Sequence, residues 1–264
     1  MTKILKIFIL ALPFGWLLSC AAPHDNPLDP ASPNYTKPEE PPIEVPDPVF
    51  SAIVRSVHKG RTTIDLYSVE TEIWPDSNMI TDSVTVQYNT TTPRRMTFNP
   101  NGHWIRSFNS NNIGDDDLEA GVGMPFTFKF YSPDSVWTTG PLSYERVIHD
   151  TPETNSPDSL QTVGPHPTFS WPDFAATFPY RYQLNVEFEN KYLAEITTVW
   201  TSDTLVSAAR SIQYPDTLPG FIDTVPNSSP DSVYYHWTLI VYDAFGNSSV
   251  SVEATFNVQA GVDK

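Results

Sequence analysis

The sequence predicts an all-β protein in which two antiparallel β-sandwich domains follow a disordered, proline-rich stalk. From residue 49 onward, short runs of alternating apolar and polar residues recur at regular spacing with turn signals between them. The chain holds 26 prolines, about double the average usage of ~5%, and proline disrupts helix interiors. No window shows a convincing helical period of 3.6 residues.

Residues 1–19 have the pattern of a secretory signal peptide. Lys3 and Lys6 form a positive start, an apolar run from Ile4 to Leu18 follows, and the small Ser19 ends the segment. The apolar run is shorter than the roughly 20 residues that a membrane-spanning helix needs. We therefore expect residues 1–19 to be removed from the mature protein.

The only cysteine of the chain, Cys20, directly follows Leu17-Leu18-Ser19. This stretch resembles the lipobox of bacterial lipoproteins, which implies cleavage before Cys20 and a diacylglyceryl group on its thiol. Ala21 and Ala22 follow, and by resemblance to the sorting rule of enteric bacteria they imply the outer membrane, with the side left open. The alternatives are an ordinary signal peptide with a chance cysteine and an uncleaved anchor helix.

Residues 20–48 are predicted to form a linker between the lipid and the folded part. Nine prolines and six carboxylates fall between residues 23 and 48. Such a stretch cannot bury a core, and it is typical of an extended polyproline-type spacer that rises about 3.1 Å per residue.

Composition excludes some classes of partner and of stabilising bond. The formal net charge is −16, and it becomes −18 when Lys3 and Lys6 leave with the signal peptide. We expect no nucleic-acid partner for so acidic a chain. With Cys20 lipidated no disulfide can form, so the domains must be stabilised by hydrophobic cores.

Residues 49–150 are predicted to form the first sandwich. Its clearest strands are 82–88, with Val84, Val86 and Tyr88 on one face, and 125–131, with three phenylalanines on one face. The sequence Asn99-Pro100-Asn101-Gly102 predicts a hairpin turn between two further strands. The pattern is immunoglobulin-like or fibronectin-like, without a sharper motif.

Residues 151–264 are predicted to form the second sandwich, after a boundary rich in proline, serine and threonine. Strands are expected at 167–171, 180–186, 197–205, 235–243 and 250–258. The run Pro167–Trp171 and the turn Asp243-Ala244-Phe245-Gly246-Asn247 resemble a bacterial fibronectin type III domain, over residues 150–260. The resemblance implies that Trp171 and Trp237 are core residues. The chain departs from that pattern at residues 215–230.

No catalytic signature is present, and we expect no enzyme activity. The best metal candidates are Asp115, Asp116 and Asp117, because calcium prefers loops that supply several oxygens. A solvated acidic loop is the favoured interpretation, so structural calcium is only a weak alternative to having no cofactor besides the lipid. The tryptophans expected to pack in cores or at strand edges, with a sugar-stacking surface as the alternative, are Trp74, Trp104, Trp137 and Trp200.

The sequence thus predicts a non-catalytic binding, adhesion or structural lipoprotein of the cell envelope. Its partners would be the membrane, through the lipid on Cys20, and an unidentified protein or glycan. A carbohydrate-binding accessory protein is the second hypothesis, and a hydrolase with a site on sandwich loops is the third. An exposed aromatic row would favour the second hypothesis and a pocket with convergent carboxylates the third.

Overall fold

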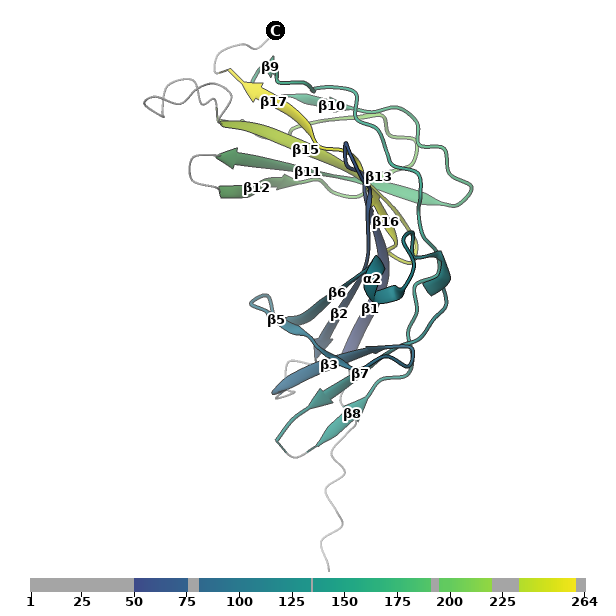
Figure 1. The fold of residues 1–264 in the computed structure, drawn as a ribbon. Helices are drawn as coiled ribbons and strands as arrows, with labels where there is room; N and C mark the ends of the chain where they lie inside the picture. Colours follow the sequence, from purple (N-terminus) through teal and green to yellow (C-terminus); the bar gives the residue numbers. More distant parts are fainter. Residues whose placement is uncertain (1–49, 76–80, 134, 191–194, 220–232, 260–264) are drawn as a thin grey trace, which may run out of the picture. The chain divides into compact units, whose positions relative to one another are not determined.

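A computed structural model describes residues 50–75, 81–133, 135–190, 195–219 and 233–259, which are almost entirely strands and their connections (Figure 1). All of them belong to one compact unit, Pro48–Lys264. The lipobox and the stalk of the sequence prediction lie outside the described residues. Among the described residues, no helix has the length and apolar character needed to cross a bilayer.

The first sandwich consists of two four-stranded antiparallel sheets. One has the order β1-β2-β6-β5, formed by Phe50–Lys59, Leu66–Pro75, His103–Asn109 and Thr97–Asn99. The other has the order β4-β3-β7-β8, formed by Arg94–Arg95, Ser83–Tyr88, Phe126–Tyr131 and Val136–Thr138. A single helical turn, α2 (Ser110–Ile113), and a 3₁₀ turn, η1 (Glu119–Gly121), follow β6.

Alternation along β3 and β7 produces the first core, as the sequence predicts. Val84, Val86 and Tyr88 are buried on β3, and the three phenylalanines of β7 are fully buried opposite them. The predicted turn between Asn99 and His103 joins β5 to β6, and Gly102 adopts the positive φ of 90° that glycine tolerates best.

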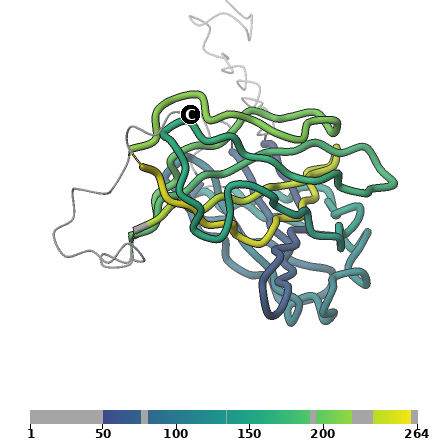
Figure 2. The backbone as a smooth tube through the Cα atoms, turned by 90° about the horizontal axis from the view of Figure 1, so that it is seen from above, coloured from purple at the N-terminus to yellow at the C-terminus, as the bar shows by residue number. Residues whose placement is uncertain are grey.

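In the second sandwich, a small sheet packs against a larger one. The small sheet pairs β10 (Thr168–Ser170) with β14 (Ser211–Gln213). The larger one is built on β11 and β15, and the bounds of its strands are as follows: β9 Gln161–Val163, β11 Tyr180–Asn190, β12 Glu195–Thr201, β13 Leu205–Val206, β15 Val233–Asp243, β16 Ser248–Val250 and β17 Ala254–Val258. Figure 2 shows the yellow C-terminal strand running beside the green and teal strands of this sandwich.

Trp237 lies at the centre of the second core. It is fully buried on β15, and its indole N–H donates to the carbonyl of Pro157 at 2.7 Å. Phe169 on β10 packs against it, with ring centroids 5.1 Å apart, and Trp171 is also buried. The core positions that the fibronectin resemblance implies for Trp171 and Trp237 are therefore confirmed.

Two predicted strands are each interrupted. The stretch 197–205 is divided between β12 and β13, which both pair with β11. The stretch 250–258 is divided between β16 and β17, because Ser251 turns inward and its hydroxyl accepts the N–H of Leu239 at 2.9 Å. The inward-facing residues of the neighbouring strands, β11 and β15, stay buried despite these breaks.

Strand order identifies the arrangement in both halves. In the immunoglobulin arrangement, strands A, B, E and D form one sheet and C, F and G the other. The orders β1-β2-β6-β5 and β4-β3-β7-β8 match this arrangement with an added C′ strand. In the second half, β10 and β14 take the B and E positions while β11, β15 and β17 take C, F and G. The predicted all-β class with antiparallel sandwiches is confirmed.

A continuous sheet joins the two sandwiches. The last three residues of β1 pair in parallel with β16, in the register Val57 with Ser248 through Lys59 with Val250. The β1-β2-β6-β5 sheet of the first sandwich and the larger sheet of the second thereby become parts of one 11-stranded sheet. The predicted boundary between residues 150 and 151 stays a prediction, since both cores share one compact unit.

Candidate binding groove at the junction of the sandwiches

A buried polar cluster lies where β1 meets β16. The fully buried side-chain oxygen of Asn247 accepts the backbone N–H of Ser56 at 3.0 Å and its hydroxyl at 3.3 Å. Asn247 donates from its amide nitrogen to Asp243 at 3.1 Å. Asp243 also accepts the backbone N–H groups of Phe245 and Asn247, so it closes the turn from which Asn247 projects.

Arg146 holds the same cluster from the connection between the sandwiches. Its Nε lies 3.0 Å from the carboxylate of Asp243, and its carbonyl accepts the Ser56 hydroxyl at 2.7 Å. Its guanidinium lies 4.9 Å from the ring centroid of Phe178, within the range of a cation–π contact. Since the Asp243 side chain is almost completely buried, its charge requires this partner.

His58 completes the joint on the other side of β1. The fully buried imidazole places Nδ1 3.0 Å from the carbonyl of Ile148 and 3.2 Å from the hydroxyl of Ser249. Because a carbonyl only accepts, Nδ1 donates to Ile148. Nε2 lies 3.3 Å from the Asp65 carboxylate without a hydrogen bond to it. Tyr67 stacks on the ring, with centroids 4.3 Å apart. On this side of β1 the joint is held by the contacts of Nδ1 and by the stacked Tyr67 ring, while Nε2 has no hydrogen-bond partner in the described residues.

An open groove of about 550 Å³ lies on the outer face of the sheet across this joint. It runs over both sandwiches because outward-facing side chains of β1, β11 and β15 share one continuous surface. These strands contribute, in that order, Arg55, Val57 and Lys59; Gln183, Asn185 and Glu187; and Thr238, Ile240 and Tyr242. Ser248 and Val250 of β16 lie between them, with Arg61 and Glu253 at the end.

Most charges of the groove are paired with a charge of the opposite sign. Arg55 bonds Glu70 at 2.9 Å and also contacts Glu72, and Arg61 lies 3.9 Å from Glu253. Lys59 has no carboxylate partner within the part of the chain that the structure describes, so its ammonium is available to a ligand.

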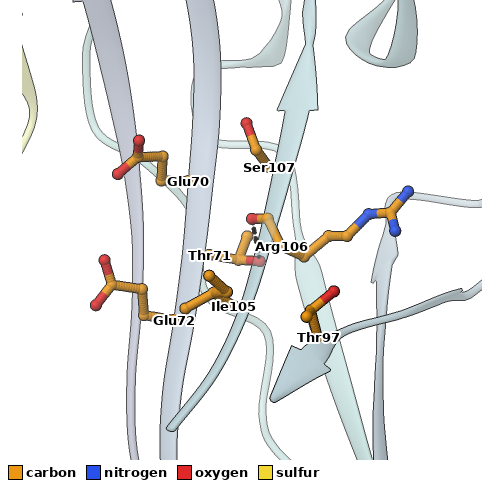
Figure 3. A pocket seen from close by; sticks show the side chains of 7 residues that line it. All are labelled: Glu70, Thr71, Glu72, Thr97, Ile105, Arg106 and Ser107. Atoms are coloured by element: carbon orange, nitrogen blue, oxygen red, sulfur yellow. Dashed lines mark hydrogen bonds between the residues drawn. The ribbon is translucent and has the colours of Figure 1, made fainter. Parts of the chain in front are cut away.

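A smaller hollow of about 460 Å³ continues the outer face over β2, β6 and β5 (Figure 3). Glu70 lines both hollows, so they meet at this residue. Thr71 donates its hydroxyl to the carbonyl of Arg106 at 2.9 Å and has no exposed surface. The remaining polar groups of this hollow are two carboxylates, the guanidinium of Arg106 and two exposed hydroxyls, those of Thr97 and Ser107.

His236 forms a cross-strand cluster next to the groove. Its Nε2 lies 2.8 Å from Glu187, and Glu189 is 3.9 Å from Nδ1. Tyr234 donates to Glu189 at 2.8 Å, and Thr198 donates to the other oxygen of Glu187 at 3.2 Å. These contacts hold Glu187 in place at the groove wall.

Two of the three aspartates predicted as weak metal candidates, Asp115 and Asp117, serve as local hydrogen-bond acceptors, and Asp116 between them is exposed. Asp115 accepts the N–H of Ala120 at 2.7 Å, and Asp117 accepts the N–H of Glu119 at 3.2 Å. The latter bond is the main cause that lowers the pKa of Asp117. Among the described residues, no group of three or more histidine, cysteine or acidic side chains is arranged to hold a metal ion.

The tryptophans form no exposed row in the described residues. Trp104, Trp171 and Trp237 are buried, and Trp74, Trp137 and Trp200 are half-buried. Trp200 packs against Tyr214, with ring centroids 5.4 Å apart, and Trp137 packs against the first core. This agrees with the expected packing in cores and at strand edges. Trp16 and Cys20 lie outside the described residues.

Sequence reasoning missed the joint and the groove. One signal was present: Ser56 and His58 put polar side chains on the same face of β1 as Val54, which is a core position. Polar residues in the inward phase of a strand must find buried partners. The partners, Asn247 and Ser249, are 191 residues away, and no local pattern indicates them.

Comparisons with known proteins find only distant structural similarity. No protein-family model matches the chain, and no curated protein matches it. The chain is similar to the FN1–FN3 domains of chicken CNTN1, with 11% identity over 81% of this chain and 66% of that one, and a TM-score of 0.27. It is also similar to a structure concerned with host cell surface retention of a 1.5-MDa bacterial ice-binding adhesin, with 15% identity over 81% of this chain and 65% of that one, and a TM-score of 0.24. The chain thus spans just under two thirds of each. Because both scores are below 0.5, the fold assignment rests on the strand orders and cores described above.

Proposed function

We propose that this protein is a membrane-anchored, extracytoplasmic binding or adhesion module without catalytic activity. Lipid on Cys20 would hold it to a membrane, residues 20–48 would give it reach, and the joined sandwiches would present the groove to a partner. The observation that carries the proposal is the pairing of β1 with β16, because it makes one outer face from two domains.

A groove built across a hydrogen-bonded joint suits binding. Its walls come from strands whose positions are fixed by a shared sheet and by the buried Ser56–Asn247 contact. A ligand would then lose little affinity to ordering of the protein, since the site is preorganised. Two sandwiches on a flexible tether would not offer such a surface.

The anchor is proposed from the sequence alone. A single acyl chain binds membranes only marginally, whereas a diacylglyceryl group supplies the two chains that stable anchoring needs. The acidic chain would be repelled by anionic lipid headgroups without it. We place the protein in the cell envelope, at the outer membrane, with no nucleic-acid partner and no cofactor other than the lipid.

Two measurements test this proposal. Cys20→Ser should leave the precursor uncut and unlipidated; a variant that is still processed at residue 20 and still fractionates with membranes by the same route would contradict the anchor. Lipid vesicles that carry the full chain should attach to whole cells of the producing bacterium or to its isolated envelope polymers. Thr238→Arg, which fills the groove, should abolish attachment.

The matched control places the same charge outside the groove. Val136→Arg lies on β8, where the native side chain is 59% exposed, and it should attach like the unchanged protein. Equal attachment of vesicles with Thr238→Arg, or no attachment by any of the three proteins, would contradict a binding role for the groove.

A further inference from the structure

We infer that the junction groove binds a neutral oligosaccharide, an inference that rests on the proposed binding function of this groove. Four properties of the site indicate this class of ligand. Its backbone groups are paired within the sheet, its charges are balanced, its side chains offer both hydrogen-bond donors and acceptors, and its floor is partly apolar.

The backbone of the groove is not available to a ligand. Strand β1 pairs with β2 on one side and β16 on the other, and β15 lies between β11 and the pair β16 and β17. In β1 the residues that pair on both sides are Val57–Lys59, and their N–H and C=O groups are shared between the two neighbouring strands. An added peptide strand needs an open edge, so a ligand on this face must be recognised by side chains alone.

The charges of the lining cancel. The lining holds three cationic side chains, Arg55, Lys59 and Arg61. It also holds three carboxylates, Glu70, Glu187 and Glu253. Several of these already have partners within the protein. A strongly acidic or basic polymer would therefore gain little from the groove, and the net charge of −16 would repel an acidic one at long range.

The uncharged polar groups offer both donors and acceptors. Asn185 lines the groove, and its side-chain oxygen is an acceptor without a hydrogen-bond partner in the described residues. Gln183 uses its amide nitrogen on the carbonyl of Ser202 at 3.1 Å, which leaves its oxygen free to accept. Lys59 adds free donors. Since each sugar hydroxyl both donates and accepts, a saccharide matches such a mixture.

The floor supplies apolar surface for the C–H faces of sugar rings. Val57, Ile240 and Val250 line it, and the Tyr242 ring is held by a hydrogen bond between its hydroxyl and Thr204 at 2.6 Å. The volume, about 550 Å³, is within the ~300–1,000 Å³ typical of small-molecule sites. The groove is also open, which suits a ligand that continues beyond it.

Titration calorimetry tests the inference on the full chain in a detergent without a sugar headgroup. The probes are hexasaccharides of neutral glucose, mannose, xylose and galactose, with a hexamer of galacturonic acid and one of glucosamine as charged comparisons. We expect at least one neutral hexamer to bind at submillimolar concentration. That affinity should change less than twofold between 50 and 500 mM salt, because screening acts on charges.

Two groove variants and one control locate the site. Asn185→Ala and Tyr242→Ala should each weaken the bound hexamer at least tenfold while the melting temperature shows that the fold persists, and Val136→Ala should have no effect. The inference is overturned if no neutral hexamer binds at 10 mM, if only a charged hexamer binds, or if the groove variants bind equally well.

The two proposals fail separately. If no hexamer binds while Thr238→Arg still abolishes vesicle attachment, the groove binds another kind of ligand and only the saccharide inference is wrong. If Thr238→Arg vesicles attach normally, the groove itself is not the binding surface.

Discussion

The side-chain oxygen of Asn247 lies 3.0 Å from the backbone nitrogen of Ser56, and both residues are completely buried. This contact crosses from the last turn of the second sandwich to the first strand of the first. It satisfies a backbone donor that neither sandwich could satisfy alone, at the point where β1 enters the sheet of its neighbour. The joint is thus part of the fold rather than a loose contact between domains.

Asn247→Ala should destabilise the protein substantially. The change leaves the N–H of Ser56 without its partner in a buried site and removes one hydrogen bond to Asp243, which typically costs about 1–3 kcal/mol. Urea unfolding measures the loss of free energy of unfolding. Asn101→Ala, at an exposed turn position, is the matched control and should change it by less than ~0.5 kcal/mol. A similar loss of free energy of unfolding in the two variants would contradict the stabilising role of the Ser56–Asn247 contact.

Trp237→Ala should be far more damaging than Trp200→Ala. Truncation of a fully buried tryptophan typically costs ~3–5 kcal/mol, and here the carbonyl of Pro157 also loses its donor. Trp200 is half-buried, so less packing is lost. Thermal unfolding monitored by circular dichroism compares them. A Trp237→Ala protein that melts like the unchanged one would overturn the core assignment.

Alkaline pH should destabilise the fold through its buried tyrosines. Burial raises the pKa of Tyr144 and of Tyr235 above the ordinary value of 10.0. In the unfolded chain these phenols ionise near pH 10, so the unfolded state binds fewer protons than the folded state above that pH. The stabilisation is present below pH 10 and is lost as pH rises beyond it.

Urea unfolding between pH 7 and 11 measures this dependence. The contribution of these tyrosines to the free energy of unfolding should be flat up to about pH 9 and fall above pH 10. Tyr144→Phe should make the fall shallower, although it removes the bond to the carbonyl of Leu118 and lowers stability at pH 7 by about 1 kcal/mol. An unchanged slope in this variant would show that the residue ionises freely when folded.

Removal of metal ions should leave stability unchanged. Asp115 and Asp117 already accept backbone N–H groups, so their loop is ordered by the chain itself. A ligand raises the melting temperature only when it binds the folded state, so a chelator should shift it little. A large drop that calcium reverses and that Asp116→Ala abolishes would instead identify a calcium site.

Much of the fold follows from periodicity, whereas the site does not. The alternation in β3, β7 and β15 predicts both the strands and their inward faces, because one face of each is buried in its own sandwich. Short strands such as β9 and β14 carry too few residues for an alternating pattern and were missed. They form because neighbouring strands provide a partner.

The junction depends on long-range pairing. The turn Asp243–Asn247 was recognised as a motif, but its role in holding Ser56 requires knowledge of which strand lies beside β16. Asn185 looks like an ordinary solvent-facing position in sequence, whereas Ile240 and Tyr242, which face away from the core row of their strand, indicate contact with a neighbouring domain or a partner. They become a groove only when the sheet continues into the first sandwich.

The most direct test of the account measures whether the two sandwiches keep one arrangement. Since Cys20 is the only cysteine, a Cys20→Ser protein with Val136→Cys and Val206→Cys carries two exposed spin labels, one on each sandwich. Pulsed electron paramagnetic resonance gives the distribution of distances between them. The account predicts a single narrow distribution that broadens when Asn247→Ala is added. A broad distribution already present without Asn247→Ala would contradict the joined sheet and the groove built on it.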